Sequence, residues 1–409
     1  YKTKDMHYTL DFTDFRGKSL KEDMFYRDFT INTLALDVGQ LKRQKRLDSC
    51  LVDFYGALKD IKQKRIRAIS PLSFKEDPLR VLRAFSIKAI FGFRIDAQTL
   101  RWLLKVKEDL RHISRERIRD ELFKILESEN AYEVIRELDD FKILSLILPQ
   151  IKVMYGVEQG PYHHLDVWQH SLETLRQMEL LMEELRRNRK LKSYLAEIIS
   201  PTRKRCGLVK FACILHDIGK PQSKLHKDGR TIFHGHERVA IKIIRDIVEQ
   251  LKLSQDEYSA LKKMVFWHLR PGYLADNEVL TERAKFRYFR DTAEEAVSVL
   301  LLSLADQRAT RGRLTTKESR LRHEKVCSGL IKEFFIRREQ KEIVRLITGD
   351  DLIKILHLTP SPLFSKILGE VEEAQAAGEI TTKKQALALA RDIARTFLRY
   401  GDNKVAKSG

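Results

Sequence analysis

The chain has 409 residues, with 77 basic and 58 acidic side chains and a formal net charge of +19. This length accommodates two or three domains, each with a core of its own, and no apolar run is long enough to span a bilayer. The basic surplus favours a polyanionic partner such as a nucleic acid, although a soluble basic protein without such a partner has the same composition.

The four cysteines, Cys50, Cys206, Cys213 and Cys327, have no CxxC spacing. Cys213 lies within the apolar run 211–215, which predicts a buried side chain. We therefore expect reduced thiols rather than a disulfide framework or a zinc knuckle. Because no segment has the pattern of a secretory signal peptide, the sequence predicts a cytoplasmic protein.

The first 70 residues contain short runs of alternating hydropathy that predict strands. From Asp77 onward nearly every segment has helical periodicity, including the apolar positions within 118–126 and the long segment 383–399. The predicted fold is therefore mainly α, with a small mixed α/β part at the start of the chain. The strand candidates are 7–12, 31–38, 51–54 and 66–69.

A basic run lies between residues 186 and 206, where Pro201 interrupts it. Such a run is usually a solvated face, and the alternative is a stripe that contacts RNA. Both interpretations place it in a surface excursion. Its basic residues are Arg186, Arg187, Arg189, Lys190, Lys192, Arg203, Lys204 and Arg205.

Three segments near the start carry side chains suited to handling a nucleotide. Residues 8–13 form a predicted strand with one acid, Asp11, among apolar residues. Residues 27–32 have the sequence RDFTIN, and residues 76–83 have the sequence EDPLRVLR.

Asp77 and Arg80 are three residues apart, so a helix would place them on one face. A carboxylate there can accept from the exocyclic amine of cytosine or adenine, while a guanidinium donates to the neighbouring ring acceptors. Such a pair accepts C and A and disfavours U and G without a template. The alternative is that Asp77 caps a helix whose first residue is Pro78.

Together these segments resemble the class II nucleotidyltransferases, which add CCA, CC or A to tRNA, or poly(A) to RNA. Residues 53–60 and 113–118 match further segments of that family in the same order, although Ala57 stands where a second glycine is usual. The resemblance implies tRNA and CTP as partners, with ATP as an open alternative. The residues that it implies for nucleotide binding are Arg27, Asp28, Asn32, Glu76, Asp77, Arg80 and Arg83.

In this family, transfer to a 3′-hydroxyl uses Mg²⁺ held by clustered carboxylates. The resemblance gives Asp11 the place of a third, catalytic carboxylate, and the alternative is a strand-end acid with no role. The chain contains neither the family's GGxVRD turn nor its DxD strand. We therefore interpret the first residues as the remnant of a head domain, and we expect the 409-residue chain alone to incorporate no nucleotide.

The segment 15–23 joins the Asp11 strand to the RDFTIN segment almost directly. Family members that add the terminal A have a flexible loop there. The short connection therefore resembles the CC-adding branch. A poly(A) polymerase of the same family remains the alternative.

Histidines and aspartates form an ordered series in the middle of the chain. Imidazoles and carboxylates on converging helices can hold one or two divalent transition metals with an open position, and water bound there becomes a nucleophile toward a phosphoester. The series is His170, His216, Asp217, His236, His268 and Asp306.

With its HDIGKP context at residues 216–221, the series resembles the HD superfamily of phosphohydrolases. The resemblance implies a catalytic role for His216 and Asp217 and an ion such as Mn²⁺ or Ni²⁺. His163, His164 and His234 are candidates for contacts to substrate or to metal ligands. Arg308, Arg311 and Arg313 could meet a phosphate or form a solvated face.

These resemblances imply four parts. They are a head remnant at 1–70, a helical neck that binds nucleotide and RNA at 71–150, an HD domain at 151–312 and a tRNA-binding helical tail at 313–409. The alternative from another class is a protein whose only activity is HD hydrolysis, with the head remnant serving as an RNA-binding module. The sequence leaves the oligomeric state open.

Overall fold

The structure is a computed structural model that divides into two compact units. Asp11 and most of the strand expected at 7–12 lie outside the described residues. The first unit comprises residues 1–155, 194–211 and 242–258, and the second comprises 156–193, 212–241 and 259–409. The structure describes every residue except 1, 4, 5, 8–11, 45, 162, 201, 228, 229, 313, 341–343 and 406–409.

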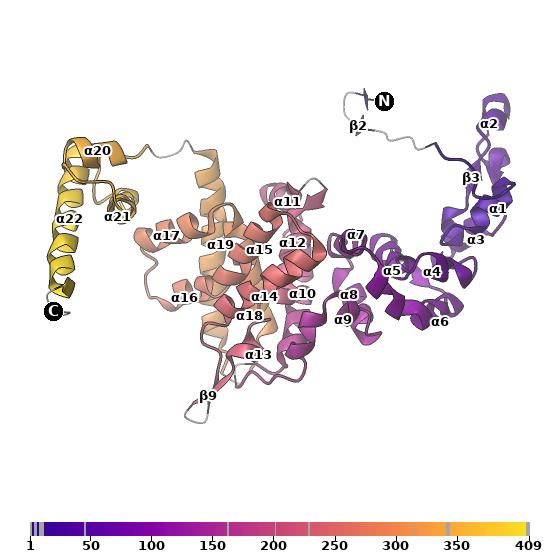
Figure 1. The fold of residues 1–409 in the computed structure, drawn as a ribbon, viewed down its shortest axis with the longest axis horizontal. Helices are drawn as coiled ribbons and strands as arrows, with labels where there is room; N and C mark the ends of the chain where they lie inside the picture. Colours follow the sequence, from indigo (N-terminus) through magenta and orange to yellow (C-terminus); the bar gives the residue numbers. More distant parts are fainter. Residues whose placement is uncertain are drawn as a thin grey trace. The chain divides into compact units, whose positions relative to one another are not determined.

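The first 155 residues are mainly helical (Figure 1), and the helical prediction from Asp77 onward is confirmed. Their elements are β1 (Lys2–Thr3), β2 (Met6–His7), α1 (Leu20–Phe25), the 3-10 helix η1 (Thr30–Asn32), β3 (Ala35–Leu36), α2 (Val38–Gln44), η2 (Asp48–Cys50), β4 (Leu51–Val52), α3 (Ala57–Lys62), β5 (Arg65–Ile66), α4 (Leu72–Glu76), α5 (Arg80–Phe91), β6 (Arg94–Ile95), α6 (Ala97–Val106), η3 (Lys107–His112), α7 (Arg115–Leu126), α8 (Ala131–Asp140), α9 (Leu144–Ile147) and η4 (Pro149–Met154).

The strands are shorter than predicted, and those described form only two-stranded pairs. The strand expected at 31–38 is wrong over most of its length, because η1, β3 and the start of α2 occupy it. Local polar contacts explain the difference: the hydroxyl of Thr33 donates to the carbonyl of Thr30 and stabilises the 3-10 turn.

Asp60 connects three of these elements. Its carboxylate is fully buried and accepts hydrogen bonds from the hydroxyl of Thr30 on η1 at 2.7 Å and from the Nε atoms of Arg65 and Arg67 at 2.8 Å each. Burial alone would raise the pKa of Asp60, but these donors lower it on balance. The aspartate therefore stays ionised and ties η1 to α3 and β5.

From residue 156 the helices are longer (Figure 1). The elements are α10 (Val167–Glu184), α11 (Arg189–Leu195), β7 (Ile198–Ser200), β8 (Arg203–Lys204), α12 (Arg205–Leu215), α13 (Lys220–Ser223), β9 (Leu225–Lys227), β10 (Arg230–Ile232), α14 (His236–Leu251), α15 (Gln255–Trp267), α16 (Arg270–Asp276), α17 (Glu282–Thr292), η5 (Ala293–Glu295), α18 (Ala296–Ala309), α19 (Lys317–Glu339), α20 (Gly349–Lys354), α21 (Leu363–Ala376) and α22 (Lys383–Val405).

Helix α18 is the centre of the second unit. Residues 296–305 are all buried, as expected for a helix that is apolar on every side. It packs against α10 and α19, so that its last turn, with Asp306, is fixed by the core. No helix in the described part of the chain is both long and apolar enough to cross a membrane.

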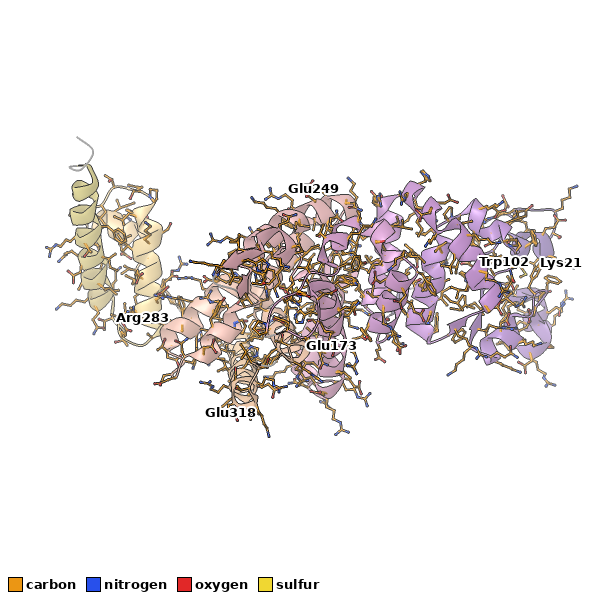
Figure 2. The ribbon with its side chains drawn as sticks, turned by 90° about the horizontal axis from the view of Figure 1, so that it is seen from below. Lys21, Trp102, Glu173, Glu249, Arg283 and Glu318 are labelled. Atoms are coloured by element: carbon orange, nitrogen blue, oxygen red, sulfur yellow. The ribbon has the colours of Figure 1, made fainter. Side chains whose placement is uncertain are left out.

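Helices α20 to α22 surround an apolar cluster of their own, which includes Ile347, Ile367 and Ala390. Acidic side chains on and after α21 form ion pairs with arginines of α17. Arg283, labelled in Figure 2, pairs with Glu379 through its Nε at 2.8 Å.

The basic run at 186–206 is not a uniform solvated surface. Arg203 and Glu257 are both buried, and the guanidinium of Arg203 donates to both carboxylate oxygens of Glu257. Arg205 is also buried and pairs with Glu197 at 3.0 Å. For these two arginines the predicted surface excursion is wrong, because buried ion pairs neutralise them inside the first unit, with Glu257 54 positions from Arg203 and Glu197 eight positions from Arg205.

Removing one partner of the buried Arg203–Glu257 pair should destabilise the first unit strongly. Arg203→Ala leaves the Glu257 carboxylate buried without its cation, which costs about 3–5 kcal/mol. Urea denaturation should show this loss, whereas Arg187→Ala, at an exposed arginine of the same run, should leave the unfolding midpoint unchanged. Equal midpoints for both variants would contradict the assignment.

The pair also predicts a dependence on pH. Burial raises the pKa of Glu257, but hydrogen bonds from Arg203 and Ser254 lower it on balance below its ordinary value of 4.5. The stabilisation is therefore fully present above pH 4.5 and is lost as the pH falls through the lower pKa of the folded state. The stability difference between wild type and Glu257→Gln should be largest near neutrality and shrink in acid.

Candidate functional sites

The RDFTIN segment and α5 share a network centred on Asp28. One carboxylate oxygen of this buried aspartate accepts from the backbone N–H of Phe29 at 2.7 Å and from the amide of Asn32 at 2.9 Å. The other oxygen lies 3.0 Å from Nε of Arg83. The structure therefore brings Asp28, Asn32 and Arg83 together, and the guanidinium of Arg83 stays half exposed.

Arg80 has a position that the sequence does not reveal. Its side chain is buried, and its guanidinium donates to Oγ of Ser73 at 2.8 Å and to the carbonyl of Tyr26 at 2.8 Å. Glu76 lies 3.8 Å from the same group. Arg80 thus connects α4 and α5 to the chain just before Arg27, whose exposed guanidinium donates to the carbonyl of Asn32.

Asp77 does not share a helical face with Arg80, so that part of the sequence argument is wrong. It has an extended backbone between α4 and α5, because the ring of Pro78 disfavours a helical conformation in the preceding residue. Its carboxylate accepts from the backbone N–H of Leu79 at 3.2 Å and from Arg117 at 2.7 Å. Helix α5 begins at Arg80 with Leu79 as its N-cap, so Asp77 is not the N-cap expected in the alternative interpretation; its contacts with Leu79 and the exposed Arg117 fix the carboxylate.

The six histidines and aspartates of the series in the middle of the chain converge from separate elements. His170 lies in the first turn of α10, His216 and Asp217 follow α12, and His236 begins α14. His268 follows α15, and Asp306 lies on α18. Their ligand atoms fall into two groups, each with its atoms within 4.8 Å of one another: His170 with His216 and Asp306, and Asp217 with His236 and His268.

Three of the histidines are oriented in the same way. The Nδ1 atom of each contacts the backbone carbonyl three residues earlier, at 2.9 Å for His216, 2.9 Å for His236 and 2.6 Å for His268. Since a carbonyl only accepts, Nδ1 of each ring carries a proton. The fold therefore directs the Nε2 atoms of all three rings into the cluster.

Asp217 lies between the two groups. Its Oδ2 is 3.2 Å from Nε2 of His216 and 3.7 Å from Nε2 of His170, and its Oδ1 is 3.4 Å from Nε2 of His236 and 3.9 Å from Nε2 of His268. One carboxylate thus faces two sets of nitrogen donors through its two oxygens, which suits a ligand shared by two cations.

The charge states of Asp217 and His268 also fit cations. Burial opposes ionisation of Asp217, but His216 and Lys220 hold its pKa well below the usual range. Burial lowers the pKa of His268 to about 3, which keeps this ring neutral. Nε2 of His216 and Oδ1 of Asp217 are buried without a hydrogen-bond partner. Such atoms are costly unless a ligand completes them.

Lys220 and Gln159 contact the cluster, although the sequence predicts a role at this site for neither residue. The buried ammonium of Lys220 donates to Oδ2 of Asp217 and to Oε1 of Gln159, both at 2.6 Å. The spacing of three residues from Asp217 was the available signal for Lys220, whereas nothing local marks Gln159. The ring of His163 lies 4.8 Å from that of His170.

Other candidates lie apart from these contacts. His164 and His234 are exposed. Arg308 pairs with Glu184 at 2.9 Å, and Nε of Arg311 donates to the carbonyl of Arg308. Arg313 lies outside the described residues. A phosphate-binding role for these arginines stays a prediction.

Gly219 allows α14 to approach the HDIGKP turn. A Cβ at this position would lie 2.1 Å from the carbonyl oxygen of His236 and 2.6 Å from the backbone nitrogen of Ala240. No side chain fits there without displacing the backbone that carries His236. The glycine is therefore required by packing at the cluster rather than by its own dihedral angles.

Three family models match the chain in order. They are the poly A polymerase head domain at residues 2–67, a probable RNA and SrmB-binding site of polymerase A at 92–154, and the HD domain at 167–311.

Similar proteins match over most of the chain. An A-adding tRNA nucleotidyltransferase of Deinococcus radiodurans is 30% identical over 90% of this chain and 78% of the relative. A CC-adding tRNA nucleotidyltransferase of Thermus thermophilus is 27% identical over 98% of this chain and 82% of the relative. The solved structure of a Thermotoga maritima CCA-adding enzyme complexed with tRNA has a TM-score of 0.54 at 18% identity, covering 92% of this chain and 74% of that one.

The matches confirm the family that the motifs indicate. The chain belongs to the class II nucleotidyltransferase family of CCA-adding enzymes, and it carries an HD domain of the phosphohydrolase type.

Proposed function

We propose that this protein adds nucleotides to the 3′ end of tRNA, with CTP as a substrate. The observation that carries the proposal is the match to two tRNA nucleotidyltransferases over at least 90% of the chain. The Asp28 network and the Asp77–Arg117 pair supply hydrogen-bonding groups for a ribose and a base edge. The net charge of +19 suits an RNA partner.

Within this activity, the short connection at residues 15–23 favours CC addition. CC addition is also the activity named for the Thermus thermophilus relative. The greater identity to the A-adding Deinococcus radiodurans relative supports the alternative of A addition. Incorporation of CTP and ATP, each supplied alone to tRNAs ending before or after the two C residues, decides between them.

We propose phosphoester hydrolysis as the activity of the HD domain, with the six clustered side chains as ligands of two divalent ions such as Mn²⁺ or Ni²⁺. When bound, the ions supply an activated water and stabilise charge on the phosphoryl group. The chain's own residues hold the ligands: carbonyls orient three imidazoles, and Lys220 balances the charge of Asp217. For the transferase, Mg²⁺ is the proposed ion and Asp11 a proposed ligand.

The division into a head remnant, neck, HD domain and tail at 1–70, 71–150, 151–312 and 313–409 is part of the proposal, with tRNA contacts in the neck and tail. A cytoplasmic location is supported by the four free cysteines, since disulfides are rare in reducing compartments.

Replacing the base-reading carboxylate should relax nucleotide choice. In the protein expressed from its complete gene, Asp77→Ala should raise misincorporation of UTP or GTP relative to CTP by about tenfold, the effect of one lost base contact of about 1–3 kcal/mol. Single-nucleotide incorporation into tRNA lacking its 3′ end measures this. Affinity for tRNA and its salt dependence, which rest on phosphate contacts, should not change.

Arg111→Ala, at an exposed arginine that pairs with Glu108 three residues earlier, is the control and should keep wild-type base choice. Unchanged base choice in Asp77→Ala would limit this residue to its structural contacts with Leu79 and Arg117.

Metal content should follow the two ligand groups. We expect wild type to bind two divalent ions per chain, His268→Ala to lose one, and Asp217→Ala to lose both, because Asp217 faces both groups. Elemental analysis after dialysis measures this directly. His234→Ala, at an exposed histidine two residues from His236, should keep both ions, and equal losses in His234→Ala and His268→Ala would contradict the assignment.

Gly219→Ala should damage the same site through the backbone. The added methyl would overlap the carbonyl of His236, so α14 must move and its histidine with it. We expect loss of metal and of phosphoester hydrolysis with the helical circular dichroism retained. Gly369→Ala, where a Cβ meets nothing within 4 Å, serves as the control. Wild-type metal content in Gly219→Ala would show that the close approach is not required.

A further inference from the structure

A pocket of about 260 Å³ adjoins the metal cluster. His268 and Asp306, one from each ligand group, are among its lining residues. The remaining walls come from α16, from α18 and from α19 with the segment just before it. Figure 1 shows these three helices packed together, and Glu318 in Figure 2 marks the start of α19. The pocket is therefore placed to receive whatever is attached to a phosphoryl group at the cluster.

The lining does not favour an anion as the occupant. Among the described lining residues, the charged ones besides the histidines are Asp276 and the proposed metal ligand Asp306, and there is no lysine or arginine. A polyphosphate chain would meet the carboxylate of Asp276 and no cationic side chain that balances it. The lining contains five hydroxyl-bearing residues instead: Ser303, Thr310, Thr315, Thr316 and Ser319. The hydroxyls of Thr310 and Thr316 already bond backbone groups, and that of Ser303 contacts His323.

Two further lining residues have hydrogen-bonding capacity that the protein does not use. His323 is buried, and its Nε2 contacts Oγ of Ser303 at 3.0 Å, while its Nδ1 has no partner. Burial lowers the pKa of His323 and keeps the ring neutral. Oε1 of Gln307 is also buried without a partner. A ligand with hydroxyl groups would satisfy atoms that are otherwise costly.

Part of this wall lies outside the HD match. That match ends at residue 311, whereas Thr315, Ser319 and His323 follow it on and before α19. The apolar side chains of Leu269 and Leu314 complete the lining. The combination of hydroxyl partners with apolar patches suits a compact sugar rather than a lipid or a second phosphate.

We propose that this pocket binds the uncharged, hydroxyl-bearing group of a sugar phosphate monoester, and that Ser303, Ser319 and His323 set the specificity of the HD site for such esters. The proposal rests on the hydrolase function proposed above. Hydrolysis breaks the bond between phosphorus and the ester oxygen. The sugar leaves as an alcohol with one proton of the water, and phosphate keeps the hydroxyl.

Filling the pocket tests the proposal. Gly272 lines it, and a Cβ added there meets nothing within 4 Å, so the backbone accepts a side chain at this position and Gly272→Leu should occupy part of the pocket. Gly329→Leu, on α19 outside the lining and equally open, is the matched control. The probes are ribose 5-phosphate, methyl phosphate and inorganic pyrophosphate, and the readouts are metal content, hydrolysis and binding of ribose 5-phosphate by ligand-observed NMR.

We expect the metal-loaded wild type to prefer ribose 5-phosphate over methyl phosphate by about tenfold in kcat/KM, the effect of one or two neutral hydrogen bonds. Gly272→Leu should abolish this preference and the NMR signal of binding, while metal content and turnover of methyl phosphate stay at wild-type values. Ser319→Ala should reduce the preference a few-fold, and Gly329→Leu should change nothing.

The outcomes separate this proposal from the hydrolase function. Binding of ribose 5-phosphate that Gly272→Leu removes, without hydrolysis of any probe, supports the pocket and contradicts the hydrolase. Hydrolysis with no preference for the sugar ester, a preference for pyrophosphate, or equal binding by wild type and Gly272→Leu overturns the pocket assignment and leaves the hydrolase standing.

Discussion

The second unit depends on one buried charge, the carboxylate of Asp217. An isolated carboxylate inside a protein is strongly unfavourable, so the surrounding elements must compensate it. Lys220 does so directly, and the nitrogen donors of four histidines lie within 4 Å of its two oxygens. That requirement explains why α10, α12, α14 and α15 each bring a histidine to the same point, and why Gly219 lets α14 approach so closely.

The sequence predicts the members of this cluster but not their arrangement. Histidines and aspartates stand out by residue type, and the HDIGKP context links His216 to Asp217. The sharing of Asp217 between two groups depends on where α14 and α15 pack, which no local pattern encodes. Gln159 reaches Lys220 across 61 positions, so only the fold reveals it. The roles of these residues stay predictions.

In the first unit, single residues override the regular patterns on which the predictions rest. Pro78 keeps Asp77 extended and separates it from Arg80, although their spacing suits a helical face. The hydroxyl of Thr33 stabilises a turn where alternating hydropathy predicts a strand. The basic run misleads similarly at Arg203, because the local sequence shows the cation and not the buried Glu257, 54 positions away, that pairs with it. Helix periodicity succeeds for α5, α7 and α22 because each repeats over several turns.

The two candidate sites differ in how far the protein completes them. Around Asp28 and Arg80 the described polar groups are largely paired with each other. A nucleotide would therefore meet an arrangement that is already fixed. It would add contacts through exposed guanidinium groups such as those of Arg27 and Arg83. At the cluster, His216 and Asp217 retain buried atoms without partners. Paired groups favour selection among similar ligands, because the geometry does not adapt to a wrong one. Unpaired buried groups instead favour tight binding of whatever cation completes them, since binding removes a cost already present in the fold.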